Sequence, residues 1–167
     1  MKTILDRPKI DDIDVKILRI MQRRGRITNA KLAAEVGLSA PPMLERVKKL
    51  ERAGVIEGYR AIVDANRLGR DFFVFAALTV DIKALVDVVR LEADLAAMDE
   101  VMECHHIAGE IDFLLKINLP SQEAYKRFVV EKLATIEGLS RIHSWVVLST
   151  VKASTEILIE EKEKEER

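Results

Sequence analysis

The spacing of apolar residues changes near residue 60, and this change divides the chain into two parts. Up to Gly54 apolar residues recur at the three- and four-residue intervals of helices, whereas residues 72–152 contain short apolar runs typical of strands, separated by helical stretches. The sequence therefore predicts a helical domain over 1–60, a strand and linker over 61–71, an α+β domain over 72–153 and a charged tail over 154–167. No role is predicted for the tail.

Charge divides along the chain in the same way. Residues 1–60 carry 14 Lys and Arg against 8 Asp and Glu, a net charge of +6, and residues 61–167 carry 13 against 20, a net charge of −7. The near-neutral total therefore conceals a basic first part. A basic module joined to an acidic one suggests a domain that binds a polyanion next to a domain with another task.

Three helices are expected in the first 54 residues. Asp11 or Asp12 can cap the first, Thr28 the second and Ser39 the third, because such side chains accept hydrogen bonds from the free amides of a first helical turn. Gly37 ends the second helix, and the third begins almost at once. Two helices joined by a short turn of this kind form a helix-turn-helix, whose second helix lies in the major groove of DNA.

Pro41 and Pro42 fall in the first turn of the third helix, where proline costs little because the amides have no helical partner. The prolines stiffen the helix tip and remove donors that would need solvent, so the tip can press against another surface. Helical spacing places four apolar side chains inward: Met43, Leu44, Val47 and Leu50. The outward face carries Pro41, Pro42, Glu45, Lys49 and Arg52, with Arg46 and Lys48 beside them.

This outward face, together with Ser39, is the candidate surface for binding double-stranded DNA. We expect loss of Arg46 or Lys49 to weaken binding, through a phosphate or a base contact. Two alternatives remain open. Faces rich in Lys and Arg also occur on ordinary solvated helices, and Arg46 can instead pair with an acidic residue of the first helix.

Residues 55–64 (VIEGYRAIVD) alternate and are rich in β-branched residues, which predicts a strand leaving the helical domain. Further strands are expected at 72–81, on either side of a turn at Gly109 and Glu110, and at 142–152. A helix over 82–97 and a second helix capped by Ser121 lie between them. The first of these helices is expected to turn five side chains largely inward: Ile82, Leu85, Val86, Val89 and Leu95. The order β-α-β-β-α-β predicts a ferredoxin-like fold.

Cys104 is the only cysteine, which excludes an intramolecular disulfide and suits a reducing compartment. No apolar run reaches the length of a signal peptide or a membrane span, so a cytoplasmic protein without a membrane partner is expected. Cys104 and His106 would share one face of a strand. Two ligands do not complete a zinc site, so packing is the preferred interpretation of Cys104, and no metal or cofactor is predicted.

Several short segments occur together and in order: Leu5-Asp6, Leu38-Ser39, Pro42 with Arg46, Ala53-Gly54-Val55-Ile56, and Gly109 with Asp112. With their surroundings they resemble the Lrp/AsnC (feast/famine) family of transcription regulators over nearly the whole chain except the tail. The resemblance implies a prokaryotic regulator with a winged helix-turn-helix domain followed by a ligand-sensing (RAM) domain of ferredoxin-like fold. It also implies a homodimer that often assembles into octamers and senses amino acids at interfaces between dimers.

The same resemblance suggests an effector site. It places Gly109, Glu110, Ile111 and Asp112 in the sensing turn, with Asp112 facing the ammonium group of an amino acid. Ser144 and Val146 would close the pocket from a neighbouring subunit. Family members often carry Thr at the position of Ala108 and an aromatic residue at that of Ile111. These departures favour an apolar or branched-chain amino acid, or a regulator with no small-molecule effector.

An enzyme on the same arrangement is a further alternative, because siroheme decarboxylases combine a helix-turn-helix with this fold. A porphyrin pocket would need His and Arg groups, and His105, His106 and His143 are available. The characteristic pattern of that enzyme family is absent, and no catalytic triad, phosphate loop or carboxylate pair stands out. The sequence therefore predicts no catalytic residues.

Overall fold

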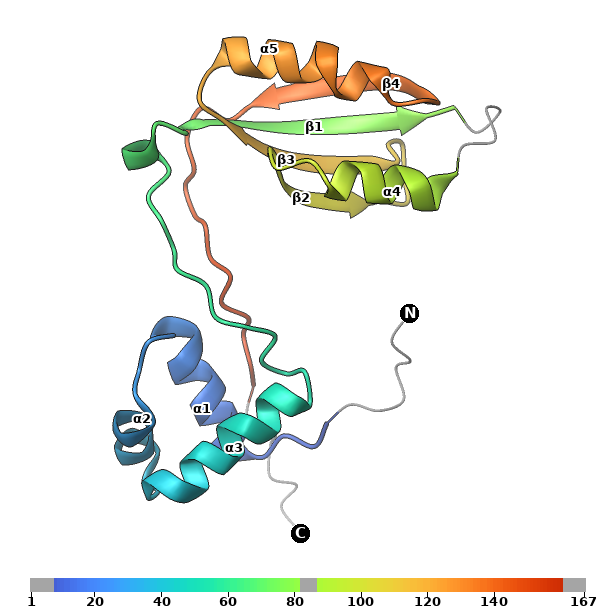
Figure 1. The fold of residues 1–167 in the computed structure, drawn as a ribbon. Coiled ribbons are helices and arrows are strands. Elements are labelled where there is room, and N and C mark those ends of the chain that lie inside the picture. The colour runs from blue at the N-terminus through green and yellow to red at the C-terminus, as the bar shows by residue number, and fades with distance from the viewer. Residues whose placement is uncertain (1–7, 82–86, 161–167) are drawn as a thin grey trace. The chain divides into compact units, whose positions relative to one another are not determined.

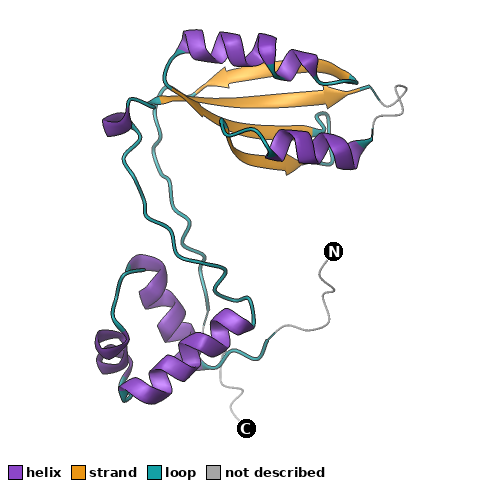
Figure 2. Ribbon diagram, in the orientation of Figure 1, coloured by secondary structure: helices purple, strands orange, loops and turns teal. Residues whose placement is uncertain are grey.

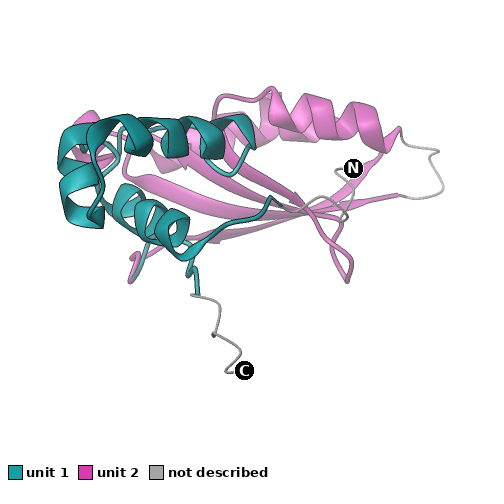
Figure 3. Cartoon of the chain, turned by 90° about the horizontal axis from the view of Figure 1, so that it is seen from below, with its two compact units in different colours: residues 1–62, 152–167 teal, residues 63–151 magenta. Residues whose placement is uncertain are grey.

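The computed structural model describes residues 8–81 and 87–160. The chain forms two compact units, which are coloured separately in Figure 3. Unit 1 comprises residues 1–62 and 152–167, and unit 2 comprises residues 63–151. The C-terminal segment thus belongs to the same unit as the N-terminal helices. No helix among the described residues is long and apolar enough to cross a membrane.

Unit 1 is built on three helices, α1 (Asp12–Arg23), α2 (Asn29–Val36) and α3 (Ala40–Arg52). Asp11 caps α1 in a reciprocal capping box with Asp14, and Thr28 caps α2 by accepting a bond from the Lys31 amide. Gly37 ends α2 in the left-handed conformation that glycine adopts without strain. The three helices enclose one apolar core: Ile17, Leu18, Leu32, Ala33, Met43, Val47 and Leu50.

The start of α3 departs from ordinary capping. Ser39 has the extended backbone of a cap residue, but its side chain makes no capping hydrogen bond. The reason is that Pro41 and Pro42 occupy the second and third helical positions, whose amides a capping serine would bind, and proline has no amide hydrogen. On the predicted inward face, Met43 is fully buried, whereas the Leu44 prediction is wrong because 37% of Leu44 is exposed.

The strand predicted over residues 55–64 is absent, and Figure 2 shows this segment as loop. Alternation and β-branched residues favour an extended backbone, but a strand also needs a partner for its ladder of hydrogen bonds. No strand pairs with residues 55–64 in the part of the chain that the structure describes. The start of the segment is held to α3 instead: the Val55 and Ile56 amides donate to the Leu50 carbonyl, and the Tyr59 hydroxyl donates a 2.8 Å hydrogen bond to Glu51.

Unit 2 confirms the predicted β-α-β-β-α-β order. Its elements are β1 (Phe72–Val80), α4 (Val88–Ala96), β2 (Val101–His106), β3 (Phe113–Leu119), α5 (Gln122–Glu131) and β4 (Leu139–Val146) (Figure 1). Short 3-10 turns precede β1 (Asn66–Leu68) and follow α5 (Leu133–Thr135). The four strands pair antiparallel in the order β2-β3-β1-β4, so β2 and β4 form the two edges of the sheet.

Both helices of unit 2 cover the same face of its sheet. Leu91 and Leu95 of α4 and Phe128 of α5 share one core with Val74 and Leu78 of β1. The opposite face, which we call the open face, carries the alternate residues of each strand. On it, Phe75 pairs with Trp145 across β1 and β4, and the two residues remain 36% and 48% exposed.

Two element boundaries differ from the prediction. The described part of the first helix of unit 2 begins at Val88, and Val89, predicted inward, is 75% exposed while Leu91 is buried. The predictions for Ile82, Leu85 and Val86 lie outside the described residues. The last strand runs from Leu139 to Val146, earlier than the predicted 142–152, because it ends where its pairing with β1 ends.

Candidate DNA-binding helix and ligand site

The outward face of α3 is open to solvent. Ser39, Pro41 and Pro42 are exposed at its tip, and within the described residues the Ser39 hydroxyl has no partner. Further along, the side chains of Lys48 and Arg52 are 50% and 71% exposed. The helix therefore offers a rigid tip without amide donors at its prolines, followed by two accessible cations.

Glu45 lies between these two cations. Its carboxylate is 3.6 Å from the Lys48 ammonium and 3.7 Å from the Arg52 guanidinium, and all three side chains are at least half exposed. Exposed ion pairs of this length contribute little, about 0 to 1 kcal/mol. Lys48 and Arg52 can therefore leave Glu45 for a phosphate at small cost.

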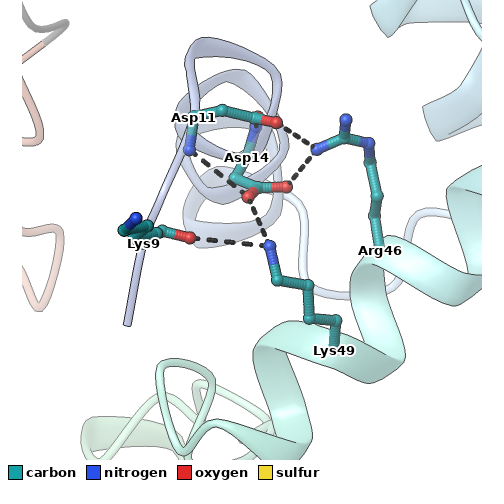
Figure 4. A network of polar contacts seen from close by, with 5 residues as sticks. All are labelled: Lys9, Asp11, Asp14, Arg46 and Lys49. Carbon is teal, nitrogen blue, oxygen red and sulfur yellow. Dashed lines mark hydrogen bonds and ion pairs between the residues drawn. The ribbon is translucent and has the colours of Figure 1, made fainter. Parts of the chain in front are cut away.

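Arg46 and Lys49 point the other way, toward the start of α1 (Figure 4). Nη1 of Arg46 lies 2.7 Å from Oδ2 of Asp11 and 2.7 Å from Oδ1 of Asp14. Nζ of Lys49 lies 3.5 Å from Oδ2 of Asp14 and 3.5 Å from the carbonyl oxygen of Lys9. Arg46 thus makes the pairing with the first helix that the sequence left open as an alternative to DNA contact.

Asp14 is the centre of this network and is fully buried. A buried carboxylate is costly unless it is paired and hydrogen-bonded, and Asp14 also accepts from the Asp11 amide through the capping box. Hydrogen bonds to Asp11 and then to Asp14 raise the pKa of Arg46. Burial pushes the pKa of Asp11 upward, but the Asp14 amide and Arg46 hold it below its ordinary value. The network ties α3 to α1 through hydrogen bonds and ion pairs.

Asp14 was missed as a functional candidate, although the sequence contains a signal for it. Ile17 and Leu18, three and four residues later, both belong to the buried stripe of α1, so Asp14 occupies a core position. A carboxylate at such a position needs a cation beside it, and the network supplies Arg46.

The predicted ligand turn joins β2 to β3. Its ends are tied together by a bond from the Ile107 amide to the Asp112 carbonyl, and the Asp112 amide binds the Leu78 carbonyl on β1. Oδ2 of Asp112 accepts a 2.7 Å hydrogen bond from the Val80 amide. Asp112 therefore has a structural task at the end of β1.

The remaining turn residues are less constrained. Gly109 and Glu110 are exposed, and Ile111 is half-buried. A Cβ added to Gly109 would meet nothing within 4 Å, and Gly109 does not have a positive φ. The fold of one chain therefore does not require glycine at this position.

Ser144 and Val146 lie elsewhere on the sheet. They pair with Ala76 and Val74 on β1, whereas Asp112 contacts the far end of β1 at Val80. The Ser144 hydroxyl is 2.5 Å from the Tyr125 hydroxyl on α5, and burial raises the pKa of Tyr125. Within one chain the structure does not bring these two residues to the turn.

Other candidates are dispersed. His106 contacts Glu92 at 3.0 Å and stacks on Phe113, while His143 stacks on Trp145. Cys104 is half-buried, and burial raises the pKa of its thiol. Over residues 8–81 and 87–160, no group of three or more His, Cys, Asp or Glu side chains could hold a metal ion.

Comparisons with known proteins agree with this architecture. Residues 10–57 match the family model of a winged helix-turn-helix DNA-binding domain, and residues 74–157 match that of the Lrp/AsnC ligand binding domain. The leucine-responsive regulatory protein of Salmonella typhimurium is 37% identical over 150 residues, which cover 90% of this chain and 92% of that protein. That of Escherichia coli is 36% identical over the same shares.

Solved structures give the same picture. A transcriptional regulator of Neisseria meningitidis in complex with L-methionine has a TM-score of 0.84 and 30% identity, covering 90% of this chain and 97% of that one. The feast or famine regulatory protein of M. tuberculosis in complex with L-methionine has a TM-score of 0.82 and 29% identity, covering 89% and 99%.

These relatives are regulators rather than enzymes, which decides against the decarboxylase alternative. The first matched segment covers the helix-turn-helix of unit 1, and the second covers the sheet and helices of unit 2 and continues to residue 157 in the C-terminal segment. The chain belongs to the Lrp/AsnC family and is a DNA-binding transcriptional regulator with a C-terminal ligand-binding domain.

Proposed function

We propose that α3 reads DNA with its outward face while its inner flank fixes the helix in place. Lys48 and Arg52 are the phosphate or base contacts, and Arg46 and Lys49 mainly position α3 against α1. The observation that carries this division is the fully buried carboxylate of Asp14, which lies 2.7 Å from Arg46 and 3.5 Å from Lys49. Both cations are held by this charge before any DNA arrives.

The tip of α3 leads into the groove. Helix starts usually hold phosphates through their free amides, but Pro41 and Pro42 have none, so this tip favours apolar contact such as that with a thymine methyl group. The Ser39 hydroxyl, which those prolines leave without a capping bond, can donate to a phosphate or a base. Glu45 can accept from a cytosine amino group.

Selection of binding sites from random DNA tests this interface. We expect an imperfect palindrome whose half-sites lie about 10 base pairs apart, or a multiple of that. If Arg52→Ala or Glu45→Ala removes a base contact, specificity at one position relaxes by about 1 to 3 kcal/mol, whereas removal of a phosphate contact weakens binding to all sequences equally. Two outcomes would contradict the proposal: selected sites with no symmetry, or outward variants that all keep both the wild-type sites and the wild-type affinity.

A homodimer supplies the symmetry, and we propose that it forms through the open face of the unit 2 sheet. Phe75, Trp145 and the His143 ring stacked on it expose apolar and aromatic surface that one chain leaves uncovered. A second copy can cover this face, because a two-fold axis brings the open faces of two subunits together. Dimers can then assemble further, for example into an octamer.

Sedimentation of Phe75→Glu tests the dimer. A charge buried in the proposed interface should yield monomers at micromolar concentration. Val130→Glu on α5 is the matched control, because Val130 is 63% exposed and lies on a helix outside the open face. A monomeric wild type, or equal effects of the two variants, would remove the open face from the interface.

For unit 2 we propose an apolar or branched-chain amino acid as effector, bound at the turn from Gly109 to Asp112 and completed by Ser144 and Val146 of a neighbouring subunit. Complexes of two similar proteins with L-methionine support a ligand of this class. One carboxylate oxygen of Asp112 is bonded to Val80, and the carboxylate's charge can still face an ammonium group. A regulator without an effector is the second candidate.

Calorimetry against the twenty amino acids separates these two candidates. Asp112→Asn keeps an oxygen acceptor for the Val80 amide but removes the charge, whereas Asp112→Ala removes both. Loss of binding in both variants, with a stable fold in the Asn variant, is the expected result. No heat with any amino acid in the wild type would leave oligomerisation as the supported role of unit 2.

We also propose that the protein acts in the cytoplasm. A transcriptional regulator must reach DNA, and a free Cys104 suits a reducing compartment.

A further inference from the structure

The C-terminal segment passes from unit 2 to unit 1. β4 ends at Val146 in unit 2, and from Lys152 onward the chain lies with the helices of unit 1. Residues 152–160 have no regular secondary structure. Their position therefore depends on the contacts that they make with α1.

Gln22 binds both backbone polar groups of one residue in this segment, Ile157. Its side-chain nitrogen donates to the Ile157 carbonyl at 3.0 Å, and its side-chain oxygen accepts from the Ile157 amide at 2.6 Å. An extended segment outside a sheet lacks a partner for these two groups. The side-chain amide of Gln22 takes the place of a neighbouring strand.

Two arginines extend the same contact along α1. Arg19 donates to the Ile159 carbonyl through Nε at 3.0 Å and Nη2 at 2.6 Å, and Arg23 pairs with the Glu156 carboxylate at 2.7 Å. Arg19, Gln22 and Arg23 stand three and four residues apart and so share one flank of the helix. Their order along α1 is the reverse of the order of their partners in the segment.

One side chain of the segment packs against the core of unit 1 and is partly buried. Ile159 packs against the apolar cluster of unit 1. Its neighbours Ile157 and Leu158 are 72% and 83% exposed. The segment is therefore held by backbone hydrogen bonds, by the Glu156 ion pair and by a single apolar anchor.

We propose that the flank of α1 formed by Arg19, Gln22 and Arg23 is a docking surface for an extended peptide, and that its occupant is residues 156–159 of this chain. The docked segment is a working part of the helix-turn-helix unit. Because the segment follows β4 in the chain, these non-covalent contacts tether α1 to unit 2 in addition to the covalent linker before β1. This proposal does not depend on the identity or existence of an effector.

Ile159→Asp and Leu158→Asp in the full chain form a matched pair of tests, because both add one charge at adjacent positions but only Ile159 is packed. Hydrogen exchange of α1 amides should become about tenfold faster in Ile159→Asp, since the anchor and its hydrogen bonds together are worth at least that factor. DNA affinity should fall severalfold in the same variant. Leu158→Asp should match the wild type in both measurements.

Gln22→Ala provides a second test on the helix side, where the exposed side chain can be removed without a cavity. It should accelerate α1 exchange by about threefold, because one pair of hydrogen bonds is removed. Equal exchange in Ile159→Asp, Leu158→Asp and the wild type would overturn the proposal. So would a wild type whose α1 protection disappears on dilution, because the occupant would then be the segment of a second chain.

Discussion

The two candidate sites differ in how much of each lies within one chain. The supports of α3, namely Lys9, Asp11 and Asp14, all belong to unit 1 and meet Arg46 and Lys49 at 2.7 to 3.5 Å. The residues proposed for the effector site lie at separate places on the sheet of unit 2. The fold of one chain can thus hold a DNA-reading helix in place. A site between subunits, in contrast, leaves its residues apart within each chain.

Among variants at the two sites, Asp14→Ala is expected to lower the free energy of unfolding most. Removing a fully buried carboxylate leaves Arg46 with a weaker partner, and we expect a loss of about 2 to 3 kcal/mol, somewhat below the values for fully buried pairs because Arg46 is 28% exposed. Urea unfolding followed by circular dichroism measures this loss. Glu45→Ala is the control, with a change within about 0.5 kcal/mol because its pairs are exposed.

Tryptophan fluorescence reports the unfolding of unit 2 in the same experiment, because Trp145 is the only tryptophan and lies in unit 2. Asp14→Ala should shift the helical signal and leave the fluorescence transition in place. A fluorescence transition that shifts by the same amount would show that the two units unfold together.

A smaller loss of stability is expected from changes at the ligand turn. Asp112→Ala removes the acceptor of the Val80 amide and should destabilise unit 2 by about 1 to 2 kcal/mol, measured by the Trp145 transition. Asp112→Asn should cost less, because its amide oxygen can replace the carboxylate. If the two variants are equally unstable, the bond to Val80 does not account for the loss.

Gly109→Ala should have almost no effect on stability, because the added Cβ meets nothing within 4 Å and the backbone is not in the left-handed region. It should nevertheless weaken amino-acid binding if a ligand approaches this backbone. Thermal unfolding and calorimetry on the same sample check both parts. A drop in stability would mean that Gly109 serves the fold.

A further small effect on stability is expected from pH. Because the pKa of Asp11 is lower in the folded chain than in the unfolded one, the unfolded chain binds more protons at acidic pH. The resulting stabilisation is present above the ordinary Asp pKa of about 4 and is lost as pH falls through the folded value. Asp11→Asn, which can still cap α1, should flatten this dependence in thermal melts between pH 7 and pH 3.

How far the sequence predicts each region follows from the range of the interactions involved. Caps at Asp11 and Thr28 and the proline start of α3 are local, and the sequence predicts them. The position of Asp14 against Arg46 needed the packing of two helices. The prediction of a strand over 55–64 was wrong because a strand needs a hydrogen-bonded partner from another part of the chain.

The C-terminal segment is a second case in which contacts between distant residues could not be predicted from the sequence. No role was predicted for this segment, but Glu156 pairs with Arg23 and Ile159 packs against the core of unit 1, and both interactions join residues far apart in the sequence. The effector residues remain unassembled in one chain for a related reason, since their proposed partners belong to a second copy.

The central claim, that Arg46 positions α3 while Lys48 and Arg52 contact DNA, is tested most directly by the salt dependence of binding. Removing one phosphate contact makes the slope of log K against log salt shallower by about 0.9. We expect this change in Lys48→Ala or Arg52→Ala, and an unchanged slope in Arg46→Ala, whose lower affinity would follow its lower stability. A shallower slope in Arg46→Ala, with wild-type slopes in the other two, would contradict the account.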